Sequence, residues 1–114
     1  MNETGVASFT VWKIPVPWVV NQGQYIAVPV GAEILSVGKQ STEDEDYGWR
    51  LVEMVVIWVR CDPTVEETEQ RGIVLVETGK AAPAPHIARH VGTVMLYDGT
   101  YVLHLFEKIG GQSE

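Results

Sequence analysis

Short apolar segments alternate with glycine, proline and acidic residues along the whole chain, and no segment repeats its apolar residues with the 3.6-residue period of a long helix. Valine recurs in these segments with Trp, Tyr, Ile and Thr, the residue types that strands favour. The pattern predicts about seven strands, over residues 9–14, 24–28, 33–38, 49–61, 72–78, 91–97 and 100–109. Because no crossover helices support a parallel sheet, we expect a mostly β fold, a small antiparallel β-sandwich or barrel.

Two turns are predicted from their residue types. Pro29-Val30-Gly31 suits a type I turn followed by a left-handed glycine, which predicts a β-hairpin between the strands at 24–28 and 33–38. Asp98-Gly99 is a strong signal for a two-residue type I′ hairpin between the last two strands.

Polar segments between the strands predict loops. Residues 40–48 include Glu43-Asp44-Glu45-Asp46 and carry too little apolar area to order themselves, so we expect a mobile acidic loop. Residues 64–70 contain a capping-box spacing and form either one helical turn or a plain acidic loop, and 86–90 is a second candidate for a helical turn. The 114 residues are expected to form a single domain, 1–114, ordered over about 9–109 with a frayed tail at 110–114.

Two features predict where strands and side chains lie in the sheets. The middle of 49–61 is apolar on both faces, which predicts a central strand covered on both sides or bent by a bulge. Pro15 and Pro17 donate no ladder hydrogen bonds, so the first strand suits a sheet edge or leaves the sheet there. The tryptophans are expected to anchor the core, with Trp18 a candidate for exposure: Trp12, Trp18, Trp49 and Trp58.

Composition narrows the class of partner. Fifteen acidic and eight basic residues give a formal charge of −7, which repels nucleic-acid phosphates. The longest apolar run, Met54 to Val59, is far shorter than the roughly 20 residues that span a bilayer, and the N-terminal residues lack secretory signal features. Cys61 is the single cysteine and is expected to be a small buried residue. We therefore expect a cytoplasmic protein that binds neither nucleic acid nor membrane.

Motifs distributed along the chain resemble one family. Val11-Trp12-Lys13 with Pro15 and Pro17 is followed by Pro29-Val30-Gly31-Ala32-Glu33-Ile34-Leu35-Ser36-Val37. Further matches are Trp58, Asp62-Pro63, Arg71, Thr78-Gly79, Gly92-Thr93-Val94 and Leu103-His104-Leu105-Phe106-Glu107. On these residues the chain resembles a family of small uncharacterised proteins of tailed phages, prophages and bacteria. The resemblance implies a phage or prophage origin and a small accessory protein, and it implies no reaction.

No familiar catalytic motif is present, so an enzyme, a cofactor and a metal are not expected. His86 and His90 are four residues apart, as in helical zinc sites, but two histidines beside Arg89 do not make a coordination shell. An enzyme would need His86 or His104 beside a carboxylate in a pocket. Glu33 and Glu107 are expected to be solvated or to pair with Lys13 or Arg71.

Two hypotheses of function follow. The first is a non-enzymatic protein-interaction module that binds a host or phage protein, or itself, through an exposed sheet edge or a patch at Trp18, Val19 and Val20. The alternative is a binding protein for a small anionic, nucleotide-like ligand, and at least two of its four candidate contacts would have to converge on one concave site: Arg60, Arg71, Arg89 and His104.

Overall fold

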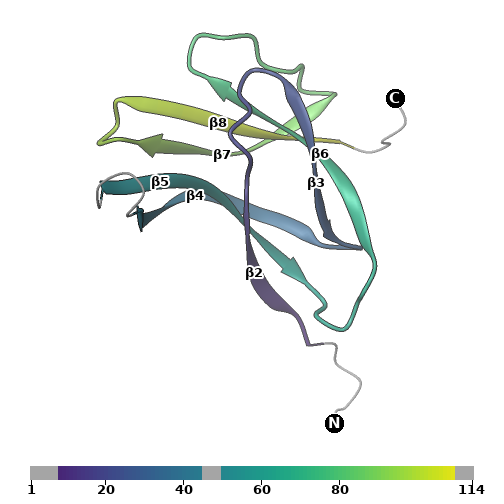
Figure 1. Cartoon of the computed structure of the whole chain (residues 1–114). Helices are drawn as coiled ribbons and strands as arrows, with labels where there is room; N and C mark the ends of the chain where they lie inside the picture. The colour runs from purple at the N-terminus through teal and green to yellow at the C-terminus, as the bar shows by residue number, and fades with distance from the viewer. Residues whose placement is uncertain (1–7, 45–49, 110–114) are drawn as a thin grey trace.

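The computed structural model describes residues 8–44 and 50–109 and folds them into two antiparallel sheets, with no helix in either stretch (Figure 1). The first sheet has the order β2-β5-β4, with strands Thr10–Pro15, Arg50–Cys61 and Glu33–Asp44. The second has the order β3-β6-β8-β7, with strands Gly23–Pro29, Thr68–Glu77, Tyr101–Lys108 and Ala88–Leu96. The predicted antiparallel β-sandwich of about seven strands is confirmed.

The core between the sheets is aliphatic. Alternate positions of each strand point inward, as the two-residue period requires, and the innermost side chains are fully buried: Val28, Ile57, Val59, Leu75, Leu96, Leu103 and Leu105. Cys61 is buried with them, and burial raises the pKa of its thiol. Trp12 and Trp58 are not the predicted core anchors, because Trp12 is 41% exposed and Trp58 is outside the core cluster, whereas Trp18 is 49% exposed, the alternative predicted for it. Trp49 lies outside the described residues.

The predicted central strand is β5, which pairs with β2 on one side and β4 on the other. Val55 and Ile57 are buried on its inner face, and Val56 is equally buried on its outer face. Trp58 lies on that outer face and its indole covers Gly38, where an added Cβ would come within 2.6 Å of the ring. The strand is therefore covered on both sides in its middle.

The predicted hairpin between β3 and β4 is wrong, although a turn is present one residue later than predicted, with Gly31 at its third rather than its fourth position. Ala32 donates its N–H to the Pro29 carbonyl at 3.0 Å, and Gly31 has a φ of +83°. After this turn the chain crosses between sheets, so that β3 pairs with β6 and β4 pairs with β5. Turn chemistry directs only a few residues, whereas each strand pairs where its apolar face meets the core.

The predicted loop at 40–48 is wrong over its first half. Gln40–Asp44 continue β4 and lie opposite Arg50–Met54 of β5. An antiparallel ladder needs backbone hydrogen bonds rather than apolar side chains, so acidic residues can extend it. Residues 45–48 of that loop and the predicted tail at 110–114 lie outside the described residues.

Residues 64–67 form the loop rather than the helical turn of the two predicted alternatives, and the candidate helical turn at 86–90 is wrong because the turn there lies at 84–88. Thr68–Gln70 begin β6, and the preceding segment is a loop in which Thr64 donates its N–H to an Asp62 carboxylate oxygen at 2.9 Å. Near 86–90 a single turn is closed by the Ala88 N–H on the Ala84 carbonyl, and Ala88–His90 then begin β7. Pairing of both segments with neighbouring strands outweighs the weak local helix signals.

The hairpin between β7 and β8 is confirmed, with a longer connection than predicted. Leu96 lies opposite Tyr101, so four residues rather than two form the loop. Tyr97 and Asp98 have φ values of 53° and 59°, and Gly99 donates its N–H to the Leu96 carbonyl at 3.0 Å. The φ pattern of a type I′ turn therefore begins one residue earlier than Asp98-Gly99.

Candidate functional site

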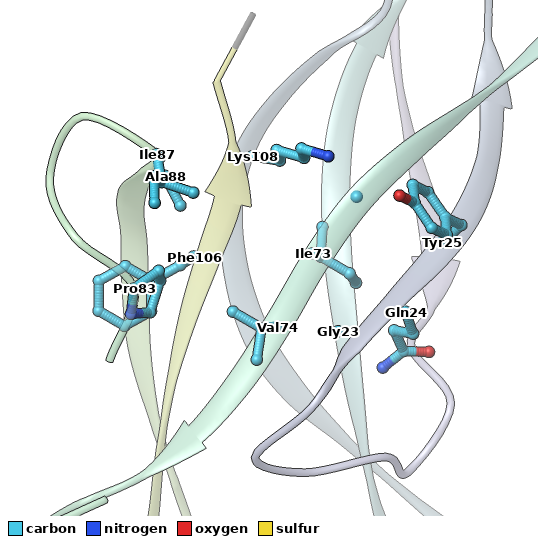
Figure 2. Close-up of a pocket in the computed structure, with 11 residues that line it drawn as sticks. Gly23, Gln24, Tyr25, Ile73, Val74, Pro83, Ile87, Ala88, Phe106 and Lys108 are labelled. Carbon is cyan, nitrogen blue, oxygen red and sulfur yellow. The ribbon is translucent and has the colours of Figure 1, made fainter. Parts of the chain in front are cut away.

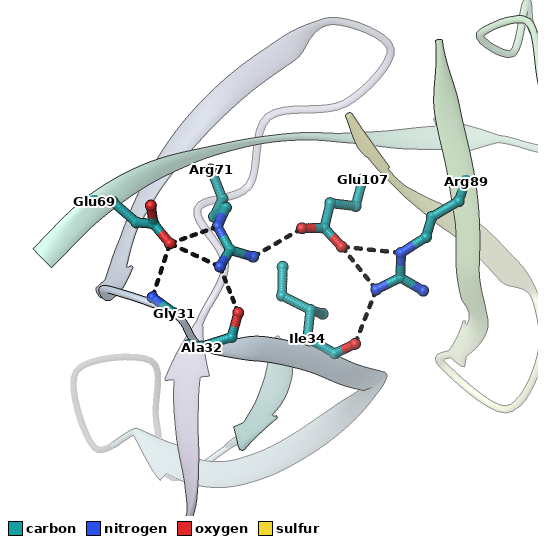
Figure 3. A network of polar contacts seen from close by, with 7 residues as sticks. All are labelled: Gly31, Ala32, Ile34, Glu69, Arg71, Arg89 and Glu107. Atoms are coloured by element: carbon teal, nitrogen blue, oxygen red, sulfur yellow. Dashed lines mark hydrogen bonds and ion pairs between the residues drawn. The ribbon is translucent and has the colours of Figure 1, made fainter. Parts of the chain in front are cut away.

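A cluster of charged side chains lies where the two sheets meet (Figure 3). Glu107 on β8 is the only buried charged residue in the described part of the chain. Arg71 on β6 approaches one of its oxygens at 3.0 Å, and Arg89 on β7 approaches the other at 2.7 Å. The ion pair with Arg71 is one of the alternatives predicted for Glu107.

The same two arginines reach across to the first sheet. Arg89 donates to the Ile34 carbonyl at 3.0 Å, and Arg71 donates to the Ala32 carbonyl. Both β4 and β7 carry a bulge here, at Ile34/Ser36 and His90/Gly92. β4 is an edge strand, and the Arg89 guanidinium gives the Ile34 carbonyl beside the bulge a hydrogen-bond partner.

Glu69 completes this cluster on the side of β6. Its carboxylate accepts from Arg71 Nη2 at 2.8 Å and from the Gly31 N–H at 3.1 Å, and these contacts hold the pKa of Glu69 below its ordinary value. Burial acts to lower the pKa of Arg71, but the carboxylates of Glu69 and Glu107 outweigh it and raise the pKa. Two guanidinium groups therefore face two carboxylates, and the cluster carries no net positive charge.

The four residues predicted to contact an anionic ligand occupy three separate places. Arg71 and Arg89 converge on Glu107, and Arg71 lines a pocket of about 200 Å³ together with Glu69 and Glu107. Arg60 pairs with Glu33 on the outer face of the first sheet, where both side chains are 55% exposed. His104 is on the outer face of the second sheet, with Thr78 and Thr93 hydroxyls 2.8 Å from its two ring nitrogens. Two of the four candidates therefore converge, and the carboxylates of Glu69 and Glu107 pair with them.

His90 and His104 lie beside threonine hydroxyls. His90 contacts Thr93 at 3.3 Å and packs against Phe106, and no group of three or more potential metal ligands occurs within 8–44 and 50–109. Threonine hydroxyls occupy both nitrogens of His104, so no carboxylate orients this imidazole.

Of the predicted patch at Trp18, Val19 and Val20, only Trp18 is largely exposed. Val20 packs against the core and bridges to Leu75, and Val19 is part-buried. The Trp18 ring packs against the Tyr101 ring, with centroids 5.6 Å apart. The Tyr101 hydroxyl donates to Glu77, and this bond, assisted by burial, raises the pKa of Tyr101 to about 12.

A shallow apolar groove of about 290 Å³ crosses the outer face of the second sheet (Figure 2). Tyr25 forms one wall, Pro83 and Ile87 form the other, and Val74 and Phe106 lie between them. Sequence reasoning missed this groove. Its signal in the sequence is weak, because only the short side chains of the strand residues Gly23 and Gly72 indicate a hollow.

The edge of β2 is defined by the direction of its backbone groups. Val16, just after the strand, donates its N–H to the Val55 carbonyl on β5 at 2.9 Å. In an antiparallel ladder, residues that bond the partner alternate with residues that face away. Phe9, Val11 and Lys13 therefore direct their N–H and C=O groups away from β5, and Pro15 takes the next outward position, where its missing N–H interrupts no ladder bond.

Apolar side chains accompany this free edge. Phe9 is 63% exposed and Val11 is 54% exposed, and Trp12 is half-exposed on the inward-facing side of the strand. The ladder between β2 and β5 has no register shift, so no bulge interrupts this edge. In Figure 1, β2 runs up from the N-terminal end of the molecule with no strand drawn beyond it in the first sheet.

The other three edge strands are modified or flanked. β4 and β7 lie against each other, carry bulges, and are joined by Arg89. β3 lies beside the segment that follows β2, where Gln24 donates to the Pro17 carbonyl at 3.1 Å. Natural sheets protect edges with bulges, charges and covering segments. In the described part of the chain, the ladder of β2 has no bulge, and the protections that this strand carries are Lys13 and Pro15.

These features define a small β-sandwich with a partly buried ionic cluster between its sheets and an edge strand, β2, whose ladder has no bulge. The family model for a domain of unknown function, DUF7352, matches residues 8–114, and the chain belongs to this family. No match is found among curated proteins or among solved structures. Within the described residues, no helix is long and apolar enough to cross a membrane.

Proposed function

We propose that this protein is a non-enzymatic interaction module, and that its partner protein adds an extended segment to the free edge of β2. The observation that carries the proposal is the row of outward N–H and C=O groups at Phe9, Val11 and Lys13 beside exposed apolar side chains. Strand addition obtains affinity from such main-chain bonds and specificity from the alternating side chains.

The role of an accessory protein encoded by a phage or prophage, acting in the host cytoplasm, belongs to the same proposal. Its support is the resemblance of the motifs between Val11 and Glu107, together with a single cysteine that is buried and unpaired. The absence of a carboxylate beside His104 favours binding over catalysis. The pairing of Arg60, Arg71 and Arg89 with carboxylates of the chain itself favours a protein partner over a small anion.

Site-specific photocross-linking tests the proposal. A photoreactive amino acid replaces Val11, and a matched probe replaces Met95, which is 59% exposed on the second sheet and therefore as accessible as Val11 at 54%. In cells that naturally carry the gene, the probe at position 11 is expected to give a discrete adduct with a protein, and the probe at 95 is not. Equal adducts from both positions, or none from position 11, would reject the interaction site.

A further inference from the structure

The free edge of β2 fits a second copy of the same chain. Resting on the proposed function, we infer that two copies pair their β2 strands antiparallel about a two-fold axis at Val11, joining two three-stranded sheets into one. In this register Val11 faces Val11 of the second copy, and Phe9 faces Lys13 of the second copy. The arrangement is isologous, as in most two-fold dimers.

Hydrogen-bond matching favours this register. Phe9, Val11 and Lys13 all face the free edge, and in antiparallel strands such residues exchange both N–H···O bonds with the residue opposite. Every outward N–H and C=O of these three residues therefore finds a partner. Pro15 lies just beyond the paired region, so its missing N–H ends the ladder without leaving an unmatched acceptor in it.

Charge points to the same register. The chain carries a formal charge of −7, which opposes self-association over most of its surface, but residues 8–18 contain no acidic residue and only one basic residue, Lys13. With the axis at Val11, Lys13 lies opposite Phe9 rather than opposite a like charge, and its ammonium group keeps its hydrogen bond to Gln40 on β4. Val11 meets Val11 on the same face.

The neighbouring registers match less well. With the axis at Lys13, the two lysines face each other and Val11 lies opposite Pro15, which has no N–H to donate. With the axis at Trp12, Phe9 lies opposite Pro15 and the Phe9 carbonyl loses its donor. Like charges directly opposite and unmatched backbone groups both cost stability.

The small size of the edge predicts a weak dimer. Among the described residues, the exposed apolar side chains at this edge are those of Phe9, Val11 and Trp12 alone. Stable interfaces bury roughly 1,000 Å² or more, which takes many more residues. Association is therefore expected to depend on protein concentration, and covalent trapping is the appropriate measurement.

Cysteine cross-linking of purified full-length protein tests the register. Val11→Cys is expected to form a disulfide-linked dimer under mild oxidation with a several-fold higher yield than Lys13→Cys, which lies on the same face of the same strand. A mixture of Phe9→Cys and Lys13→Cys is expected to cross-link between the two variants. Cys61 is 1% exposed, so the unsubstituted protein is the silent control.

Two results would overturn the second copy as partner: equal yields from Val11→Cys and Lys13→Cys, or no dimer from Val11→Cys at any protein concentration. A preferred dimer from Trp12→Cys would overturn the register. Each of these is separate from failure of the proposed function, because an adduct with a different protein from the photoreactive probe at position 11 would still locate a binding site on β2.

Discussion

Arg71 and Glu107 lie on adjacent strands of one sheet, and their ion pair, 3.0 Å between Nη1 and Oε2, stands where that sheet meets the other. Glu107 also binds Arg89, and both arginines donate to carbonyls at the start of β4. One buried carboxylate thus holds the β4–β7 side of the sandwich together. The opposite margin of the first sheet, at β2, has no equivalent contact among the described residues, and this asymmetry is why we place the partner there.

Loss of Arg71 is expected to destabilise the fold. In Arg71→Gln, Glu107 loses one cationic partner and Glu69 loses its main one, so we expect a loss of about 2–3 kcal/mol in the free energy of unfolding. The matched control is Arg60→Gln, whose partner Glu33 is exposed, and its expected loss is below about 1 kcal/mol. Denaturant titration measures both, and equal losses would show that the cluster contributes no more than a surface pair.

Close packing at Gly38 gives a second prediction. An alanine Cβ would lie 2.6 Å from the Trp58 ring, so Gly38→Ala must displace the indole and uncover Val56. We expect a destabilisation of about 1–3 kcal/mol and a changed tryptophan emission spectrum. Gly23→Ala is the control, since its added Cβ meets nothing closer than 4.0 Å. An unchanged midpoint for Gly38→Ala would show that Trp58 does not seal this face.

Tyr101 and Glu77 predict a dependence of stability on pH. Their hydrogen bond raises the pKa of Tyr101 to about 12 and holds the pKa of Glu77 below its ordinary value. Because the folded state binds the Tyr101 proton more tightly, this contribution is present below pH 10 and is lost as pH rises toward 12. The Glu77 contribution is present above the ordinary carboxyl pKa and is lost as pH falls through the lowered value.

Tyr101→Phe is expected to weaken both effects. Between pH 10 and 12, the free energy of unfolding of the variant should fall less than that of the wild type. It should also fall less than that of the wild type as the pH drops through the lowered pKa of Glu77. Tyr25→Phe, which removes a hydroxyl from an exposed tyrosine, is expected to keep the wild-type profile. Parallel profiles for Tyr101→Phe and the wild type would contradict the contact with Glu77.

Local patterns in the sequence predict the strands better than their pairing. Alternating apolar residues and the Asp98-Gly99 signal identify most strands and the last hairpin, because both depend on neighbouring residues. A turn forms at Pro29–Ala32, one residue later than predicted, yet β3 and β4 separate into different sheets, since strand pairing depends on residues that lie far along the chain. Strand order is a long-range property.

The candidate site could be predicted only in part. Pro15 indicates an edge from its chemistry alone, and the β2 edge follows from it. The convergence of Arg71 and Arg89 on Glu107 requires the order β6-β8-β7, which no spacing in the sequence contains. Exposure of Trp12 likewise follows from its place on an edge strand rather than from its residue type.

The binding role of β2 is tested most directly by affinity recovery of the partner. The tagged proteins are the wild type, Val11→Pro and Ala27→Pro, and an untagged second copy counts as a partner. Val11→Pro removes an N–H that faces away from β5, and Ala27→Pro removes the corresponding outward N–H on the β3 edge, so neither breaks a ladder bond. Thermal denaturation first verifies that both variants are folded. We then expect Val11→Pro to lose the partner and Ala27→Pro to retain it. Full recovery with Val11→Pro, or equal loss with both, would contradict the account.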